Sequence, residues 1–322
     1  TGKTVLNSST FYELYCQAEK AKKDFQCYLL VNHDEQVTVY KQIAKKLGIP
    51  QLVIGLTIVA MGTSMPEAAV SITSALSGSA GISIGNVVGS NILNILIILG
   101  ITAVLTNVRI QKTTFRYEIP FMIGITIILM AFGITGNQIT FLEGILFWLL
   151  FLIFLGYLFV ISKKGSVQDE EEIKELPLWK GVLGIIIGGI LVVKGSDFAV
   201  EGATEIARYF GMSERFIGLT IVAFGTSLPE LVTSVTAARR GNADIAIGNI
   251  VGSNIFNILF VIGTTALICN VPFDQKFVID TIVAIFSGVL LWAGTIRYKE
   301  LRKNCGIVML LCYAGYFIYL CK

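Results

Sequence analysis

Two segments of the chain are copies of each other, and this repeat limits the possible folds more than any other feature. Residues 55–100 align with residues 218–263 without a gap, and 29 of the 46 aligned positions are identical. Chance does not give such similarity within one chain, so we infer an internal duplication. We therefore expect two structurally equivalent halves.

The composition places this duplication in a membrane. The chain is 54% hydrophobic and 15% charged, whereas soluble domains carry about 25% charged residues. A helix that crosses a bilayer needs roughly 20 mostly apolar residues. Nine stretches qualify: 51–76, 83–105, 119–135, 142–162, 181–199, 215–238, 244–269, 277–295 and 305–321. We therefore predict an all-α polytopic protein of the cell membrane, a bundle of about nine transmembrane helices.

Basic residues in the loops indicate the orientation of these spans, because Lys and Arg favour the cytoplasmic side of a membrane. They follow every even-numbered span: Arg109, Lys112 and Arg116, then Lys163, Lys164, Lys174 and Lys180, then Arg239 and Arg240, and finally Arg297, Lys299, Arg302 and Lys303. The ends of the odd-numbered spans are nearly uncharged. This pattern puts the amino terminus inside and the carboxyl terminus outside.

The two copies are expected to point in opposite directions across the bilayer, because five spans separate equivalent positions. Inverted repeats are typical of secondary transporters, whose substrate site lies near the midplane between the halves. The predicted organisation is a polar cytoplasmic tail at 1–45, a first repeat half at 46–162, a cytoplasmic linker at 163–180 and a second repeat half at 181–322.

Each copy carries one acid deep inside an apolar span, Glu67 in the first and Glu230 in the second. An ionised carboxylate facing lipid costs several kcal/mol. Two carboxylates that meet at the midplane repel each other unless a cation or a proton neutralises them. A site with a charge near −2 suits one divalent cation, so we interpret the pair as the centre of a metal site.

Oxygen-bearing side chains surround these acids in the sequence. Pro66 and Pro229 precede them, and a proline frees carbonyls about one turn earlier in a helix. Thr63, Ser64, Thr226 and Ser227 add hydroxyls, and Ser90 with Asn94 shares a helix face, as does Ser253 with Asn257. Interhelical hydrogen bonding is a competing explanation for this second set, and it suits Asn86 and Asn249 best. Hard oxygen ligands favour calcium and sodium over zinc or copper.

The repeated motifs Gly-Thr-Ser-x-Pro-Glu and Gly-Ser-Asn-Ile-x-Asn resemble the paired alpha repeats of the sodium/calcium exchanger family, within the cation/calcium exchanger superfamily. The resemblance runs from about residue 42 to the end of the chain. It implies ten spans and the exchange of sodium for calcium by alternating access, with both ions as substrates and no cofactor. It also implies a ligand set made of the carbonyls of Ala60 and Ala223 and the side chains of Thr63, Ser64, Glu67, Ser90, Asn94, Thr226, Ser227, Glu230, Ser253 and Asn257.

The resemblance also bears on the counter-ion and on completeness. The proton/calcium branch carries a different motif around its acids, which favours sodium here. The potassium-dependent branch usually has Asp where this chain has Asn257, which implies potassium independence. In the second half an apolar stretch at 181–199 precedes the motif, but the equivalent stretch of the first half, about 18–37, is polar. We therefore expect the family's first span, one of the pair that slides to switch access, to be missing or replaced.

Two alternatives to sodium/calcium exchange stay open at this point. The same glutamates could release protons when calcium binds, as in a calcium/proton antiporter. A protein without the first gating helix could instead bind calcium without transporting it. An enzyme is not expected, because the sequence has no nucleophile–base pair and no cofactor loop. The net charge of +3 gives no reason to expect a nucleic-acid partner, and the oligomeric state is not predicted.

Overall fold

The computed structural model describes residues 50–78, 80–164 and 218–321, and these residues are almost entirely helical. The first half contains α3 (Gln51–Ile54), η1 (Gly55–Val59), α4 (Ala60–Thr63), α5 (Met65–Leu76), α6 (Gly81–Leu93), η2 (Asn94–Leu99), α7 (Gly100–Leu105), β1 (Val108–Arg109), η3 (Thr114–Glu118), α8 (Ile119–Gly136), β2 (Gln138–Ile139) and α9 (Phe141–Lys164). The second half contains η4 (Gly218–Val222), α12 (Ala223–Thr226), α13 (Leu228–Arg239), α14 (Ala243–Phe256), η5 (Asn257–Ile262), α15 (Gly263–Ile268), β3 (Val271–Pro272), α16 (Gln275–Thr295), β4 (Glu300–Leu301) and α17 (Lys303–Leu320). The η segments are short π-helical stretches that continue directly into the neighbouring α-helices.

Seven of the nine predicted spans fall wholly within the described residues, as does the span 215–238 apart from its first three residues, and all eight are helical where they are described. Six are single helices long and apolar enough to cross a membrane, and two are pairs of helices bent at a short break. The predicted span at 181–199 lies outside the described residues, as do the polar tail, most of the linker and the stretch at 18–37. The prediction of a helical, multi-pass membrane protein is confirmed.

The two halves are inverted relative to each other. Gln111 Nε2, which follows the helix Gly81–Leu105, donates a 2.6 Å hydrogen bond to Asp244 Oδ2 at the start of the helix Ala243–Ile268. At the other end, Cys269 Sγ lies 3.8 Å from the carbonyl oxygen of Ala75, just before the first of these helices begins. The two long helices are therefore antiparallel, as the odd number of intervening spans predicts.

Two short antiparallel ladders mark the opposite ends of the bundle. β1 pairs with β4, and β2 pairs with β3. An offset of 163 residues relates the two copies of the repeat, and the same offset takes β1 to β3, while an offset of 162 residues takes β2 to β4. The pseudo-twofold relation therefore extends from the duplicated motifs to the loops.

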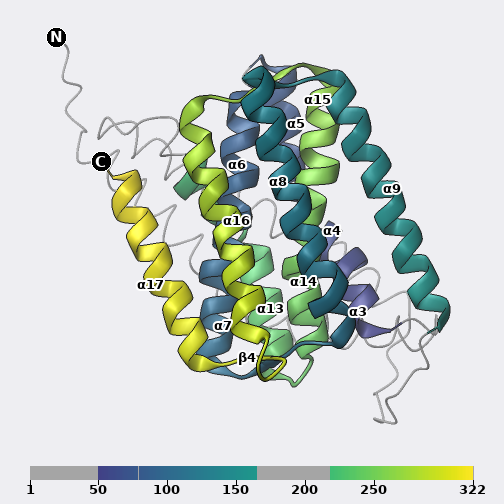
Figure 1. The fold of residues 1–322 in the computed structure, drawn as a ribbon, viewed down its shortest axis with the longest axis vertical. Helices are drawn as coiled ribbons and strands as arrows, with labels where there is room; N and C mark the ends of the chain where they lie inside the picture. Colours follow the sequence, from purple (N-terminus) through teal and green to yellow (C-terminus); the bar gives the residue numbers. More distant parts are fainter. Residues whose placement is uncertain (1–49, 79, 165–217, 322) are drawn as a thin grey trace, which may run out of the picture.

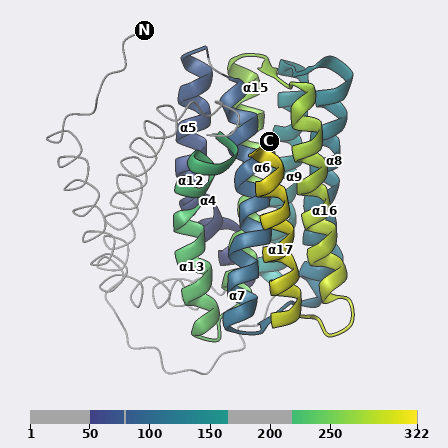
Figure 2. The same ribbon diagram turned by 90° about the vertical axis from the view of Figure 1, so that its left-hand side faces the viewer.

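The described helices form three layers. The helices Gly81–Leu105 and Ala243–Ile268 are central. Of the apolar 18-residue segment of each helix, 83% and 94% of the residues are buried. The spans containing α8, α9, α16 and α17 are only 22–39% buried, so they form the outer, lipid-facing layer on one side (Figure 1). Figure 2 shows the broken pairs α4–α5 and α12–α13 on the opposite side of α6 and α7. The repeat thus supplies two of the three layers, the central one and the layer of broken helices.

The basic loops gather at one end of the bundle. Arg109 lies in β1, which pairs with β4, and its Nε lies 3.4 Å from Glu300 Oε1. The loop that leads into β4 contains Arg297, so the two basic loops lie side by side. Arg239 ends α13, just before α14 begins at that same end. This clustering agrees with the alternating loop charges of the sequence. That this end faces the cytoplasm remains a proposal.

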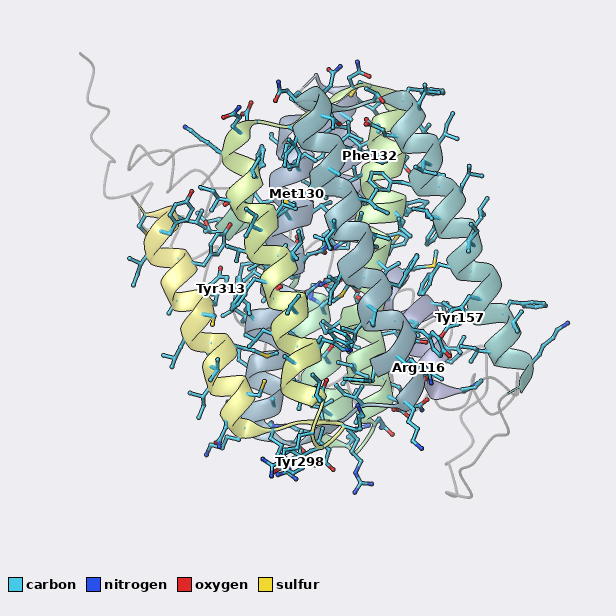
Figure 3. The ribbon with its side chains drawn as sticks, in the orientation of Figure 1. Arg116, Met130, Phe132, Tyr157, Tyr298 and Tyr313 are labelled. Carbon is cyan, nitrogen blue, oxygen red and sulfur yellow. The ribbon has the colours of Figure 1, made fainter. Side chains whose placement is uncertain are left out.

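A buried acid lies near the start of one outer span in each half. Glu118 accepts a hydrogen bond from Tyr157 Oη, and Asp280 Oδ1 accepts one from Tyr316 Oη at 3.0 Å. Both acids are fully buried. Figure 3 shows Tyr157 near the lower end of the bundle, where Arg116 also lies. The sequence prediction started this first outer span at residue 119, whereas the helix begins at Thr114, because Glu118 finds its partner on a different helix.

We expect Tyr157→Phe to lower the free energy of unfolding by about 1–3 kcal/mol, because it removes a donor from a buried carboxyl group. Thermal unfolding of the detergent-purified chain measures this. Tyr117→Phe is the matched control, since Tyr117 is 52% exposed and we expect a change within about 0.5 kcal/mol there. Equal losses in the two variants would contradict a stabilising role for the Tyr157–Glu118 hydrogen bond.

Candidate cation site

Both duplicated motifs break a helix at the same position. The axis bends by 46° between the helices on either side of Ser64 and by 51° between those on either side of Ser227. The backbone of each serine lies near φ −87° with ψ close to zero, outside the helical range. Pro66 and Pro229 occupy the first turn of the following helix, where no N–H donor is needed. The helix therefore breaks at the serine, two residues before the proline that the sequence suggested as the kink.

The two glutamates converge from opposite halves. Glu67 and Glu230 each lie in the first turn after a break and are fully buried. Ser227 Oγ donates to Glu67 Oε1 at 3.1 Å, and Ser64 Oγ donates to Glu230 Oε1 at 2.7 Å. Each carboxylate is thus held by the serine of the other copy, and the two carboxylates interact electrostatically. The helix breaks place two negative groups at the interface of the halves.

The threonines bind the halves together through two other asparagines. Thr63 Oγ1 donates to Asn249 Oδ1 at 3.0 Å, and Thr226 Oγ1 donates to Asn86 Oδ1 at 3.3 Å. Asn86 Nδ2 in turn donates to the carbonyl of Glu67 at 3.2 Å. The side-chain amides of Asn86 and Asn249 each accept through Oδ1 and donate through Nδ2 in interhelical hydrogen bonds, the role that the sequence suggested for them.

The remaining hydroxyls and carbonyls lie beside a carboxylate or beside one of the threonines at the helix breaks. Ser253 Oγ lies 3.3 Å from Glu230 Oε1 and 3.4 Å from the carbonyl oxygen of Ala60. Ser90 Oγ lies 3.4 Å from Thr226 Oγ1, which lies 3.3 Å from the carbonyl oxygen of Ala223. Ten of the twelve predicted site residues are therefore linked to one another through the two breaks: Ala60, Thr63, Ser64, Glu67, Ser90, Ala223, Thr226, Ser227, Glu230 and Ser253.

Asn94 and Asn257, the other two predicted residues, reach this region through helix packing. The helix α5, which carries Glu67, packs against η5, which begins at Asn257. The helix α13, which carries Glu230, packs in the same way against η2, which begins at Asn94. The structure therefore brings together the motifs that sequence reasoning grouped into one site.

Four buried oxygen atoms in this region have no hydrogen-bond partner among the described residues. They are Glu67 Oε2, Glu230 Oε2, Asn94 Oδ1 and Asn257 Oδ1. Buried acceptors are rarely left unpaired, because the loss of hydration is costly. These four are two equivalent pairs, one carboxylate and one amide from each half, and all are hard oxygen donors. A cation of the calcium or sodium kind suits such a set.

Sequence reasoning left Asn91 and Asn254 out of the ligand set and offered interhelical hydrogen bonding as the alternative, and both are buried and hydrogen-bonded across the two halves. It also did not foresee the π-helical stretches that begin at Asn94 and Asn257. The available signal was the identity of the Ser-Asn-Ile-x-Asn segment in both copies, since an asparagine preserved twice in a duplication needs an explanation. Among the residues that the structure describes, no group of three or more His, Cys, Asp or Glu could hold a metal ion.

The fold and the site together define a class of protein, the secondary transporter built from an inverted repeat with broken helices at its centre. Comparison with known proteins gives the family. The model of the sodium/calcium exchanger protein family matches residues 27–160 and 180–322. The chain belongs to the sodium/calcium exchanger family, and it is a multi-pass membrane protein for cation/calcium exchange.

Individual relatives agree with this assignment over nearly their whole length. The chain is 37% identical to the putative antiporter CaxA of Alkalimonas amylolytica, over 89% of this chain and 93% of that protein. It is 30% identical to the sodium/calcium exchanger MaX1 of Methanosarcina acetivorans, over 91% of this chain and 95% of that protein. A solved structure of the sodium-calcium exchanger NCX_Mj matches with a TM-score of 0.77 at 30% identity, and the match covers 94% of this chain and 98% of the other.

Proposed function

We propose that the chain exchanges sodium for calcium across its membrane by alternating access, and that it does so without potassium. The observation that carries this proposal is two pairs of buried oxygens from inverted halves that have no hydrogen-bond partner in the described part of the chain: Glu67 Oε2 and Asn94 Oδ1 with Glu230 Oε2 and Asn257 Oδ1. The relatives named as sodium/calcium exchangers support sodium as the counter-ion.

The proposed ligands are oxygens in sufficient number for calcium, which takes six to eight of them. The set is the carbonyls of Ala60 and Ala223 with the side chains of Thr63, Ser64, Glu67, Ser90, Asn94, Thr226, Ser227, Glu230, Ser253 and Asn257. The two carboxylates supply a formal charge of −2. One calcium ion balances this charge, and sodium ions balance it as well. The two kinds of ion therefore compete for one set of oxygens, which favours exchange over cotransport.

The inverted repeat gives such a site a route to each side of the membrane. Each half presents an equivalent broken helix to the centre, and the two point in opposite directions, as the antiparallel central helices do. A rearrangement that opens one half towards one side has a counterpart in the other half, related to it by the pseudo-twofold axis, that opens towards the other side. Alternating access in inverted-repeat transporters follows from this relation.

Potassium independence rests on the charge at position 257. An aspartate there would add a third acid and favour a further monovalent cation. Asn257 is neutral and donates Nδ2 to Asn91 Oδ1 at 3.1 Å, so the site keeps a formal charge of −2. We propose that calcium exchange needs sodium alone.

Radioactive calcium uptake into proteoliposomes that contain the full chain tests the proposal. We expect uptake when sodium is trapped inside and removed outside, and the same rate whether or not potassium is present. Vesicles loaded with choline are the control and should take up at most a small fraction of that calcium. Uptake driven by a pH gradient without sodium would instead establish calcium/proton exchange, and calcium binding without any flux would establish a non-transporting protein.

A further inference from the structure

Four asparagines meet where the two central helices cross, and we call them the asparagine cluster: Asn91, Asn94, Asn254 and Asn257. Asn91 Nδ2 donates to the backbone carbonyl of Asn254 at 3.2 Å, and Asn254 Nδ2 donates to the carbonyl of Asn91, also at 3.2 Å. Asn257 Nδ2 donates to Asn91 Oδ1 at 3.1 Å, and Asn94 Nδ2 donates to Asn254 Oδ1 at 2.9 Å. All four side chains are buried, so water does not compete for these groups.

The backbone carbonyls fix the orientation of the first two amide groups. A carbonyl oxygen can only accept a hydrogen bond. Asn91 must therefore turn its NH₂ group towards the carbonyl of Asn254, because the reversed amide would set two oxygens against each other. Asn254 is held in the same way by the carbonyl of Asn91.

The orientation passes from these two residues to the other two. With its NH₂ group held by a carbonyl, Asn91 has only Oδ1 left for Asn257, so Asn257 must present its NH₂ group to Asn91. The same reasoning makes Asn94 present its NH₂ group to Asn254. The oxygens of Asn94 and Asn257 consequently point away from the cluster, and these are two of the four buried oxygens that find no partner within residues 50–78, 80–164 and 218–321.

We propose that Asn91 and Asn254 are positioning residues of the cation site, each of which orients the amide oxygen of a ligand from the opposite half. Asn91 orients Asn257, and Asn254 orients Asn94. This role rests on the proposed function, in which Asn94 and Asn257 coordinate the transported ion. Without its partner, an asparagine ligand can rotate its amide and present N–H donors to the cation, which repels them.

The local helix geometry agrees with this role. The π-helical stretches η2 and η5 begin at Asn94 and at Asn257, the two oriented residues. In each helix the carbonyl three residues earlier accepts a donor from the opposite helix. An inserted donor disturbs the regular hydrogen-bond ladder, and π-helical turns occur frequently at functional sites. The cluster thus shapes the helix at the point where each ligand side chain leaves it.

Calcium binding to the full chain in detergent, measured by isothermal titration calorimetry, tests the proposal through double mutants. We expect Asn91→Leu and Asn257→Leu each to weaken calcium binding about tenfold, which corresponds to about 1.4 kcal/mol. We expect the double variant to be about tenfold weaker as well, instead of a hundredfold, because Asn91 acts only through Asn257. A hundredfold loss of calcium affinity in this double variant would overturn the proposal.

The chain supplies its own control pair. Asn91 and Asn94 lie in the same half and belong to different orienting contacts, so Asn91→Leu with Asn94→Leu should multiply to about a hundredfold loss. If the double variants of both pairs fell equally short of the product of their single effects, Asn91 would act on the fold as a whole, which contradicts a specific positioning role.

Two further outcomes keep the test decisive. If Asn91→Leu does not fold, Asn91→Asp replaces it, because a protonated carboxyl group donates its O–H to the carbonyl of Asn254 and accepts from Asn257 Nδ2, as the amide does. Calcium affinity should then stay within about twofold of that of the unaltered chain. A tenfold loss in Asn91→Asp contradicts the proposal. If the unaltered chain binds calcium and Asn91→Leu binds it equally well, only the positioning role fails. If the unaltered chain binds no calcium, the proposed function fails first.

Discussion

Replacing Glu67 by Gln abolishes sodium-driven calcium uptake in proteoliposomes, and replacing Glu230 by Gln does the same. Glutamine keeps the size of the side chain and an oxygen that can accept from Ser227 or Ser64, so the fold should persist. The site charge falls from −2 to −1. One pair of unit charges at 4 Å is worth about 4 kcal/mol near a protein surface, so we expect calcium transport to fall at least ~100-fold.

Glu300→Gln is the matched control for this pair. Glu300 lies in β4 at the end of the bundle, where it is ion-paired with Arg109 at 3.4 Å and with Arg302 at 3.6 Å. Its loss changes the net charge of the chain by the same amount, and uptake should stay within about twofold, since surface ion pairs are worth at most about 1 kcal/mol. Because Glu67 and Glu230 are equivalent, unaffected uptake in either variant would refute the shared charge that the site needs.

Gly252→Ala prevents the two halves from closing on each other. A Cβ atom at Gly252 would lie 2.8 Å from Ala60 Cβ and 2.8 Å from Leu56 Cα, too close for any real contact. The added methyl group therefore has to push the central helix α14 away from η1 and α4. Overpacked interiors lose up to about 3 kcal/mol of stability, occasionally more. We expect the variant to unfold at a clearly lower temperature in detergent or to elute as aggregate.

Gly156→Ala serves as the control for this substitution. Gly156 lies in the outer helix α9, and a Cβ atom there would meet nothing within 4 Å. This variant should unfold at or slightly above the temperature of the unaltered chain, because alanine favours the helix over glycine. If Gly252→Ala unfolded at the same temperature as Gly156→Ala, that result would contradict the close packing of α14 against η1 and α4.

The fold was predictable to the extent that it depends on hydrophobic runs and on self-similarity. Eight predicted spans and their inversion are confirmed, because a bilayer leaves a long apolar segment few alternatives to a helix. The start of the span Thr114–Gly136 was predicted five residues too late, at 119, because Glu118 and Arg116 look like loop residues in a linear sequence. Only the structure shows that Tyr157, on another helix, makes burial of Glu118 possible. The boundaries of the tail, the linker and the two halves stay predictions.

The residues of the candidate site could be predicted from the duplicated motif, but the hydrogen bonds among them could not. Two acids repeated in inverted copies have to meet near the centre, and the Ser–Glu contacts between the halves bear this out. Which asparagine coordinates and which one orients depends on which carbonyl faces which amide across the helix crossing. Asn91 and Asn94 are equally polar and equally repeated, so residue type alone does not separate them; the family resemblance singled out Asn94, and the hydrogen-bond partners show what Asn91 contacts. The coordinating roles themselves remain a proposal.

The most direct test of the account is an anomalous-scattering map of the crystallised chain in strontium, a heavier stand-in for calcium. We predict one strong peak per chain within about 2.7 Å of Oε2 of both Glu67 and Glu230, a distance slightly longer than calcium–oxygen bonds. The peak should also contact the amide oxygen of Asn94 or Asn257. A peak bound to only one half, or no peak at concentrations that support uptake, would contradict the central claim that both halves share one cation.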